Sequence, residues 1–348
     1  MTRRAEAVTL VAAMVLVGAP GARAWDDLGH MEVAAVAFPQ LTPASHKRVA
    51  ALLRRNPSYA NWIAGARKVD RDRIAFLRAA TWADAIKSDH AYKDDEQGDS
   101  TAAQNLGYGD LLRHRYWHYV DRPFSPDGTP LVEAKAPNAA TQIARFRAVL
   151  AAAGGDDGVK SYDLTWLLHL VGDVHQPLHC VSRFDRQTPG GDDGGNKVKI
   201  TGNTAPAICD DPRYCPFGPP GELHTFYDVL TGQSYAVGAA DAAAAALPPA
   251  RPSQSRVADE AAWIQEGWEL AQSRIYVAPI GIGAGPFTID ADYQRAATAL
   301  ARQRISLAGA RLARLLNDCF QKEAAAAPPP STGRRPSPEG LRRRRLGT

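Results

Sequence analysis

The chain has 348 residues, of which 45% are hydrophobic and 22% charged, so it is long and apolar enough to bury a large core. Its formal net charge is +4, but residues 1–24 carry +2 and residues 324–348 carry +5, which leaves about −3 for the body. A body without excess positive charge cannot bind a polyanion mainly by counterion release. If the protein binds phosphate esters, a metal ion must supply the positive charge.

Residues 1–24 have the layout of a secretory signal peptide. Two arginines precede an apolar run, which ends in an Ala-x-Ala site at residues 22–24. Cleavage at this site would make Trp25 the first residue of the mature protein, with a free amine. We therefore expect a secreted or periplasmic protein. No later stretch is apolar over the length of a bilayer span, so we expect no membrane anchor.

The body predicts an all-α fold with one domain from residue 25 to residue 323. Apolar residues recur at three- and four-residue spacing in segments 29–38, 43–55, 70–87, 138–155, 259–276 and 289–319. Segment 162–179 is apolar nearly all round, which predicts a helix buried in the centre of the fold.

The remaining segments predict loops and one small piece of β-structure. Residues 88–108 are polar and contain glycine, which indicates a loop. Residues 181–221 are rich in Gly, Pro and Asp, and only the KVKI run alternates like a strand, so a short β-hairpin is expected near residues 196–202. Residues 324–348 are rich in Pro and Arg, which predicts a disordered tail.

Four cysteines in an exported chain predict two disulfide bonds. Three pairings are compatible with the sequence. We favour a short Cys209–Cys215 loop together with a long-range bridge between Cys180 and Cys319. The chain contains no C-x-x-C spacing, so a cysteine-ligated zinc ion is not expected.

The buried segment 162–179 carries His169 and Asp173, four residues apart. On a helix this spacing places an imidazole and a carboxylate on one face, where both can bind one cation. An unpaired charge inside an apolar core is costly, so the two groups must be compensated. The alternative is a His–Asp pair that satisfies itself within the core. His175 lies on another side of this helix, outside the predicted metal site.

Further nitrogen and oxygen donors occur along the chain. His224 and Asp228 form a second i, i+4 pair, and Pro177 favours a turn that brings His179 back towards the buried helix. The other candidates are His30, Asp84, His118 and Asp121. Each is weak evidence alone. Together they offer imidazole and carboxylate donors without a thiolate, a set that suits zinc.

These residues lie in motifs that resemble the S1/P1 nuclease family. W-x4-H at residues 25–30, WAD, WHYVD, HLVGDVHQPLH, GGN and H-x3-D occur in that family's order, over about residues 25–230. The family comprises secreted, mostly α-helical phosphodiesterases that bind three zinc ions. The two closing helical segments agree with this architecture without carrying a motif.

The resemblance implies three Zn²⁺ ions with protein ligands. The first ion is buried and has four ligands: Asp84, His118, His169 and a bridging Asp173. The second is bound by the amine and carbonyl oxygen of one residue and by two side chains: Trp25, His30 and Asp173. The third has three ligands: His179, His224 and Asp228. On this view, signal-peptide cleavage creates one of the metal ligands.

The implied activity is hydrolysis of single-stranded DNA and RNA, and of 3′-nucleotides, to 5′-phosphorylated products. The attacking group is a water molecule activated by the metal pair that Asp173 bridges, with Asp84 in the same cluster. Lys87 stands where the family usually has an arginine that contacts phosphate. Lysine keeps the charge but loses the two-pronged donor geometry. The alternative for Lys87 is a solvent-facing helix position.

The resemblance also implies a substrate-binding rim. Tyr119 takes the place of an aromatic residue on which a base stacks, although core packing is an equal alternative. Asp121 would bind the edge of the base or orient the terminal amine of Trp25. Asn196 would border the same cleft, and the long insert before the GGN motif would shape its rim. We expect a monomer whose partners are its nucleic-acid and nucleotide substrates.

Two other protein classes compete with this interpretation. A zinc phospholipase C also uses a terminal tryptophan and three metals, but its first histidine lies farther from the tryptophan, and its last ligand pair ends in Glu rather than Asp228. A secreted helical protein could instead bind metals for structural reasons only. Its metal sites would be closed, whereas a catalytic site keeps open positions.

Overall fold

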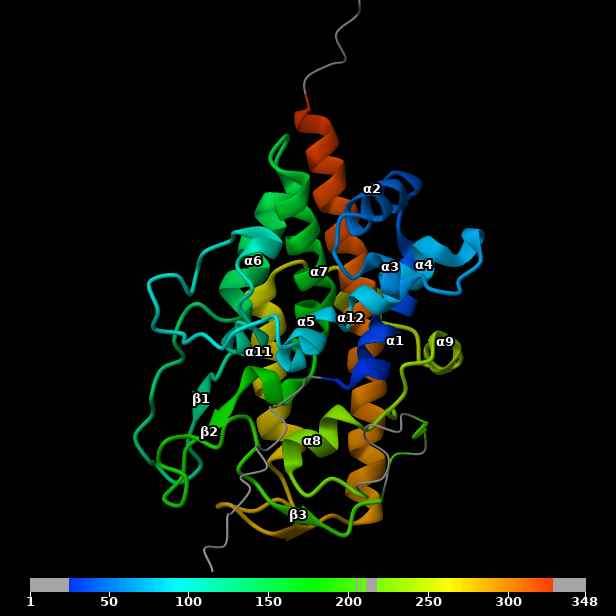
Figure 1. Cartoon of the computed structure of the whole chain (residues 1–348). Coiled ribbons are helices and arrows are strands. Elements are labelled where there is room, and N and C mark those ends of the chain that lie inside the picture. Colours follow the sequence, from blue (N-terminus) through cyan, green and yellow to red (C-terminus); the bar gives the residue numbers. More distant parts are fainter. Residues whose placement is uncertain (1–24, 205, 207, 211–217, 328–348) are drawn as a thin grey trace, which may run out of the picture.

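The computed structural model describes residues 25–204, 206, 208–210 and 218–327, and it confirms the all-α fold (Figure 1). In chain order the α-helices are α1 (Asp27–Ala37), α2 (Pro43–Leu53), α3 (Tyr59–Trp62), α4 (Arg71–Ala79), α5 (Trp82–Ala85), α6 (Ala139–Ala151), α7 (Asp157–Asp173), α8 (Leu223–Asp228), α9 (Val237–Ala245), α10 (Pro252–Ser255), α11 (Glu260–Leu270) and α12 (Ala291–Ala326). The strands are β1 (Pro123–Phe124), β2 (Ser182–Arg183), β3 (Ile200–Thr201) and β4 (Phe287–Thr288).

Helix α7 lies in the centre of the fold, as its apolar sequence predicts. Every residue from Lys160 to Asp173 is buried. Helices α1, α2, α5, α6 and α12 all contact it, so no face of α7 is left for solvent (Figure 1). A polar side chain on this helix therefore has to find its partner inside the protein.

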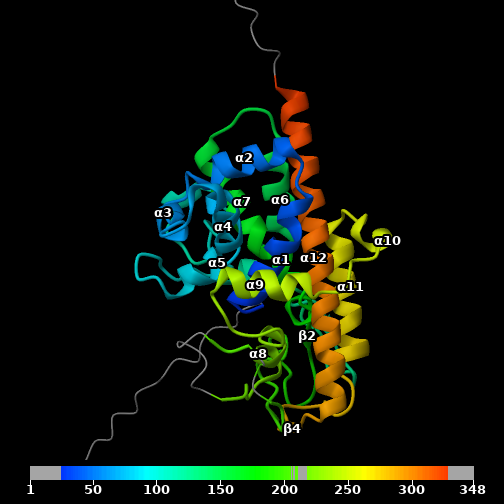
Figure 2. The same cartoon turned by 90° about the vertical axis from the view of Figure 1, so that its right-hand side faces the viewer.

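Helix α12 runs the length of the molecule and packs against α1 and α6 (Figures 1 and 2). Gly309 allows α1 to approach closely, because a Cβ atom at this position would lie 2.5 Å from Cβ of Val36. The helix ends at Ala326, beyond the predicted boundary at residue 323, because the alanines that open the predicted tail are strong helix formers. The predicted signal peptide and the rest of the tail lie outside the described residues.

The segment at residues 70–87 is broken where the sequence predicts one continuous helical period. Helix α4 ends at Ala79, and α5 begins at Trp82 and continues into a 3₁₀ turn over Ile86–Ser88. The break leaves the carbonyl oxygen of Ala80 available to a partner outside its own helix, and that partner is His169 of α7.

The predicted β-hairpin near residues 196–202 is wrong. Strand β3 does lie in the KVKI region, but it pairs in parallel with the distant β4, with Ile200 opposite Phe287. The neighbouring Lys199 forms an isolated antiparallel bridge with Glu222. Two-residue strands contribute few ladder hydrogen bonds, so the partner is set by the packing of a small second core, which includes Val198, Ile280 and Ile289.

The predicted Cys180–Cys319 disulfide is also wrong. Both cysteines are free and buried. The thiol of Cys180 lies 3.3 Å from the carbonyl oxygen of Val174, and that of Cys319 lies 3.5 Å from the carbonyl oxygen of Arg147 on α6. Each thiol thus packs as a small apolar side chain against different backbone. The Cys209–Cys215 pairing stays a prediction, because Cys215 lies outside the described residues.

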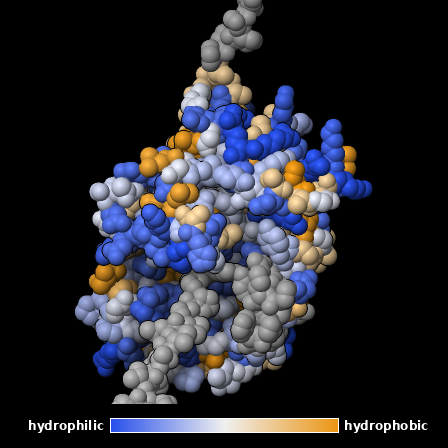
Figure 3. Space-filling model, in the orientation of Figure 1, coloured by the Kyte–Doolittle hydropathy of each residue, from blue (hydrophilic) through white to orange (hydrophobic). Residues whose placement is uncertain are grey.

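Within the described ranges, no helix is both long and apolar enough to cross a membrane. On the face shown in Figure 3, hydrophobic residues form small separate patches among hydrophilic ones.

Candidate metal centre

Three groups of buried histidines and aspartates have donor atoms within 4.8 Å of one another. The groups are His30, Asp84 and His169; His118, His169 and Asp173; and His179, His224 and Asp228. The donors come from α1, α5, α7 and α8 and from the 3₁₀ turns Arg115–His118 and Pro177–Cys180. The fold thus brings together all eight side chains that the sequence analysis names as metal ligands.

Asp173, the last residue of α7, lies between three imidazoles. Its Oδ1 is 3.3 Å from Nε2 of His30 and 3.3 Å from Nε2 of His169. Its Oδ2 is 3.0 Å from Nδ1 of His118. The rings of His30 and His169 stack with their centroids 3.8 Å apart. A carboxylate that uses its two oxygens in two directions can bridge two cations, as the resemblance implies for Asp173.

Asp84 of α5 closes the other side of this cluster. Its Oδ1 lies 3.6 Å from Nε2 of His169 and 3.8 Å from Nδ1 of His118. Nζ of Lys87 lies 2.6 Å from the same oxygen. Lys87 is only 8% exposed, so the solvent-facing alternative for this residue is wrong. The lysine places a fixed positive charge beside the cluster.

The third group lies where α8 meets the turn after α7. Nε2 of His179 is 3.0 Å from Nε2 of His224, which is 3.6 Å from Oδ2 of Asp228. Gln176 donates from Nε2 to the other oxygen of Asp228 at 2.9 Å, and its Oε1 accepts from the backbone N–H of Leu178. Gln176 therefore orients one donor of this group and caps the short turn that carries another.

Hydrogen bonds to backbone carbonyls set the tautomers of three histidines. Nδ1 of His169 donates to Ala80, Nδ1 of His179 to His118 and Nδ1 of His224 to Gly194, at 2.7, 2.8 and 2.7 Å. Because a carbonyl oxygen only accepts, each Nδ1 must carry the proton. Each Nε2 then presents a lone pair to its group. In the third group two such lone pairs face each other at 3.0 Å, an arrangement that a metal ion between them, or a proton on one of them, would stabilise.

Burial and neighbouring charges keep the imidazoles neutral. Burial lowers the pKa of His169 to about 4, and burial with the charge of Lys87 holds the pKa of His118 well below its usual range. Neutral imidazole is the form that binds metal. For Asp84, burial would raise the pKa, but Lys87 and the histidines outweigh it, so the carboxyl stays ionised.

The pKa of Asp173 is shifted in the opposite direction from that of Asp84. Burial and the nearby charge of Asp84 raise its pKa well above the usual value. Burial likewise raises the pKa of Asp228. Two carboxylates in one buried cluster repel each other unless a cation is added. The electrostatics of the protein alone are therefore unfavourable to two ionised carboxylates here, and bound cations would reverse this.

Several buried donor atoms make no hydrogen bond among the described residues. Those in this cluster are Nδ1 and Nε2 of His30, Nε2 of His118, Oδ1 of Asp173 and both carboxylate oxygens of Asp84. Buried polar atoms are paired in the great majority of native structures, so a group of exceptions in one place requires an explanation. All of them are nitrogen or oxygen atoms of residue types that bind zinc, so the donor set fits this metal.

Trp25 is fully buried beside this cluster. Its indole nitrogen donates to the carbonyl oxygen of Gly172, next to Asp173, at 3.1 Å. The following residue, Asp26, donates its backbone N–H to the carbonyl oxygen of Asp228 at 3.0 Å. The side chain and the next peptide thus hold the start of the described chain between two of the donor groups. Its predicted role as a metal ligand depends on cleavage before this residue and stays a prediction.

Of the predicted substrate-binding residues, Tyr119, Asp121 and Asn196 are partly exposed, whereas Lys87 is buried. Tyr119 lies partly against the core, and burial together with Asp121 raises its pKa to about 12. Burial and the charge of Asp193 raise the pKa of Asp121 to about 7. Asn196 donates to the carbonyl oxygen of Asp193 at 2.7 Å. Asp193 thus connects all three electrostatically or by hydrogen bond, which is consistent with one shared rim.

An all-α fold that gathers imidazole and carboxylate donors from separate helices in its interior defines a helical protein built around a metal cluster. The family model described as S1/P1 Nuclease matches residues 25–321, so the chain belongs to the S1/P1 nuclease family. It is accordingly a hydrolase that acts on phosphodiester bonds of nucleic acid, in a zinc-dependent family whose members are typically secreted. No curated protein matches the chain significantly.

Sequence reasoning missed the residues that orient the donors. Gln176 stands inside the HLVGDVHQPLH motif, where its position between His175 and Pro177 was a signal that went unused. Ala80 and Gly194 act through their carbonyl oxygens. Backbone atoms occur at every position, so no residue type in the sequence could have identified them.

Proposed function

We propose that the protein is a zinc-dependent endonuclease that hydrolyses single-stranded DNA and RNA, and 3′-nucleotides, to 5′-phosphorylated products. The observation that carries this proposal is the presence of three buried groups of imidazole and carboxylate donors, two of which share His169 and contain donor atoms without hydrogen bonds. We assign three Zn²⁺ ions to the cluster, with Asp173 shared between the first two. Bound zinc would supply a water of lowered pKa and positive charge for the phosphate.

The side chains of the chain have distinct tasks in this proposal. Asp84 and Asp173 hold the metal pair, and the carbonyl-bonded histidines aim their Nε2 atoms at the ions. Lys87 adds a cation 2.6 Å from Asp84, where it would also attract a phosphate oxygen as a point charge. Tyr119, Asp121 and Asn196 would bind the base, with stacking on Tyr119 tolerant of any base.

The start of the mature chain belongs to the same proposal. Cleavage before Trp25 would free an amine beside His30 and Asp173, because the indole of Trp25 already binds the residue preceding Asp173. The amine and the carbonyl oxygen of Trp25 would complete the second metal position. We propose a secreted or periplasmic monomer with a nuclease domain at residues 25–323 and a tail at residues 324–348.

The decisive experiment compares purified mature protein with its chelated form. We expect about three zinc ions per chain by metal analysis, a first residue of Trp25, and cleavage of single-stranded DNA that disappears on chelation and returns with zinc. Phosphatidylcholine should not be hydrolysed. Full nuclease activity after exhaustive chelation would overturn the proposal, and release of phosphocholine would favour the lipid-directed alternative instead.

A further inference from the structure

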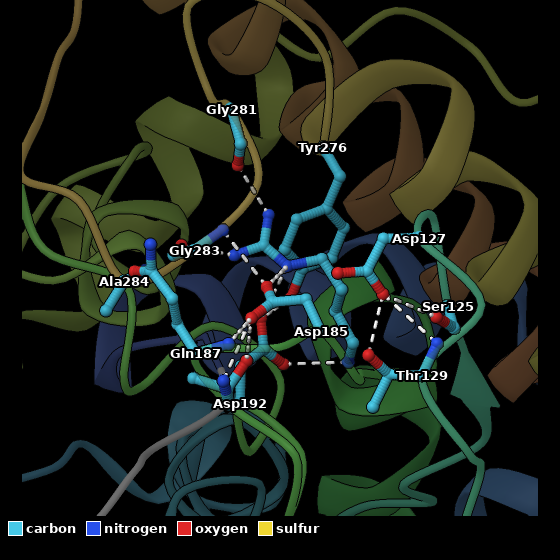
Figure 4. A network of polar contacts seen from close by, with 12 residues as sticks. Ser125, Asp127, Thr129, Asp185, Gln187, Asp192, Tyr276, Gly281, Gly283 and Ala284 are labelled. Atoms are coloured by element: carbon cyan, nitrogen blue, oxygen red, sulfur yellow. Dashed lines mark hydrogen bonds and ion pairs between the residues drawn. The ribbon is translucent and has the colours of Figure 1, made fainter.

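The insert at residues 181–195 is anchored to a second loop by Arg183. This side chain is buried, and its guanidinium donates to the carbonyl oxygens of Gly281 and Gly283 at 2.7 and 2.6 Å (Figure 4). It also lies over the ring of Tyr276, 4.7 Å from the ring centroid. A buried guanidinium with partners on another segment fixes the two segments relative to each other.

Asp192 is the second anchor of the insert, and its carboxylate is fully buried. One oxygen accepts from the backbone N–H of Arg183 at 2.9 Å. The other accepts from the hydroxyl of Tyr276 at 2.8 Å (Figure 4). Tyr276 directly follows the π-helical turn Ala271–Ile275 that continues α11. Asp192 therefore joins both ends of the insert to the end of a long helix.

The turn that follows Asp192 has an unusual backbone. Asp193, Gly194 and Gly195 all have positive φ angles, of 53°, 61° and 86°. A Cβ atom on Gly194 would lie 2.4 Å from the carbonyl oxygen of Leu178, so only glycine fits there. Non-glycine residues adopt this conformation at a cost, and the turn keeps it only if its surroundings hold it. The hydrogen bonds of Asp192 to Arg183 and Tyr276 fix the start of this turn.

The backbone of this turn places one carbonyl oxygen so that it accepts a hydrogen bond from a proposed metal ligand. The carbonyl oxygen of Gly194 accepts from Nδ1 of His224 at 2.7 Å. This bond selects the tautomer with its proton on Nδ1 and directs Nε2 towards Nε2 of His179, 3.0 Å away. If the Gly194 carbonyl moved or rotated, His224 would lose the partner that sets its tautomer and ring orientation.

We propose that Asp192 is a positioning residue for the third metal position, because it holds the Gly194 carbonyl that orients His224. The insert is thus a support for one metal ligand as well as part of the rim. This inference rests on the proposed function, since it assumes that His179, His224 and Asp228 bind an ion. Removing a group that orients a metal ligand typically lowers metal affinity by about 10- to 100-fold.

The test measures zinc affinity in the full-length mature protein with the variants Asp192→Ala and Tyr276→Phe. Competition with a chelator should show that one of the bound zinc ions is held about 10- to 100-fold more weakly in Asp192→Ala, with the others unchanged. Tyr276→Phe removes a single hydrogen bond and should give a smaller shift in the same direction. Excess zinc should restore activity in both variants.

Asp127→Ala is the matched control. Asp127 lies in the same network and accepts from Thr129, Ser125 and the backbone N–H of Arg186, but among the described residues it has no hydrogen bond to the turn at residues 193–195 (Figure 4). Its zinc affinity should equal that of the wild type. Equal weakening in this control, or wild-type affinity for every ion in both Asp192→Ala and Tyr276→Phe, would overturn the inference. Absence of zinc and nuclease activity in the wild type would instead refute the proposed function.

Discussion

Two clusters of buried polar residues meet at the end of α7, and they satisfy their polar atoms in different ways. In the metal centre, His30 and Asp173 keep donor atoms that make no hydrogen bond within the described chain. The second cluster, here called the arginine cluster, consists of His175, Glu266, Arg304 and Arg311. In it Glu266 accepts from Arg304 at 3.0 Å and from Arg311 at 2.7 Å. In the first cluster the unpaired atoms belong to several donor residues, whereas in the second the carboxylate pairs with both arginines and only Nη2 of Arg304 makes no hydrogen bond among the described residues.

The histidines of the two clusters have similarly lowered pKa values but differ in the hydrogen bonds of Nε2. His169 in the metal centre and His175 in the arginine cluster both have pKa values lowered by burial, and both donate Nδ1–H to a backbone carbonyl. Nε2 of His169 lies 3.0 Å from Nδ1 of His118 and also faces Asp173 and Asp84, whereas Nε2 of His175 lies 3.0 Å from a nitrogen of Arg311. The second nitrogen of His175 therefore accepts from a cationic donor. That of His169 lies among carboxylates and another imidazole, the surroundings that the proposed metal site predicts.

The largest effect expected from this comparison is that of Asp173→Asn. Loss of the bridging carboxylate should lower nuclease activity by about three orders of magnitude, because metal catalysis contributes several kcal/mol. The metal-free variant should be no less stable than metal-free wild type, since burial and the charge of Asp84 raise the pKa of Asp173 and both disfavour an ionised carboxylate there. Activity assays with zinc analysis, and urea unfolding in chelator, measure the two effects. Near-normal activity would mean that Asp173 does not bridge the ions.

The arginine cluster should respond to Glu266→Gln in the opposite way. Glutamine keeps one acceptor oxygen but removes the negative charge that neutralises two buried arginines, and breaking a buried ion pair costs about 3–5 kcal/mol. The side chain of Glu266 is 30% exposed, and solvent screening weakens the pair, so we expect the free energy of unfolding to fall by about 3 kcal/mol, at the lower end of this range. The zinc content at saturating zinc should not change. Loss of zinc without loss of stability would show that the two clusters are not independent.

The comparison also shows what the sequence could predict. The His169–Asp173 pair follows from helical spacing, which is a local property, and α7 has the buried central place that its composition predicts. The eight side chains that the structure brings together could be named because each is a residue type with few other uses in an apolar interior, and their binding of metal stays a prediction. Their orientation was not predictable, because it depends on carbonyls such as that of Ala80, which is free only where α4 breaks.

Non-local pairings were the failures of the sequence analysis. Ile200 pairs with Phe287 across the fold, and no local pattern identifies such a partner for a two-residue strand. An even number of cysteines suggested that Cys180 would pair with Cys319, but parity says nothing about distance. Lys87 was ambiguous for a related reason. A lysine three residues after an aspartate suits either an exposed helix face or a buried pair, and only the packing decides.

A substitution of Gln176 tests whether residues that orient the proposed ligands also contribute to zinc affinity. Replacing it with methionine removes the hydrogen bond to Asp228 and the cap of the turn before His179, while keeping the volume similar. We expect zinc affinity at the third position to fall by about 10- to 100-fold. Gln142→Met is the control, because Gln142 is equally buried and its Nε2 makes no hydrogen bond. Chelator competition on both variants distinguishes a specific loss from a general effect of replacing a buried amide.

Glu32 is a buried carboxyl that belongs to neither cluster, and it predicts the smallest effect. It is 1% exposed, and burial raises its pKa from 4.5 to about 8, with Thr231 and Arg302 opposing this only in part. The native state therefore binds the proton more tightly than the unfolded chain does, so Glu32 makes the protein less stable as pH rises from about 4.5 to about 8.

The variant Glu32→Gln cannot lose that proton. It should match the wild type at pH 5 and exceed it at pH 8 by about 1–2 kcal/mol in the free energy of unfolding, below the limit that about 1.4 kcal/mol per pKa unit sets. Urea unfolding at both pH values in chelator removes the pH dependence of zinc binding from the comparison. A stability difference that does not change between pH 5 and pH 8 would show that Glu32 is ionised in the native protein. It would then need a charged partner in the native state, as Glu266 has in Arg304 and Arg311.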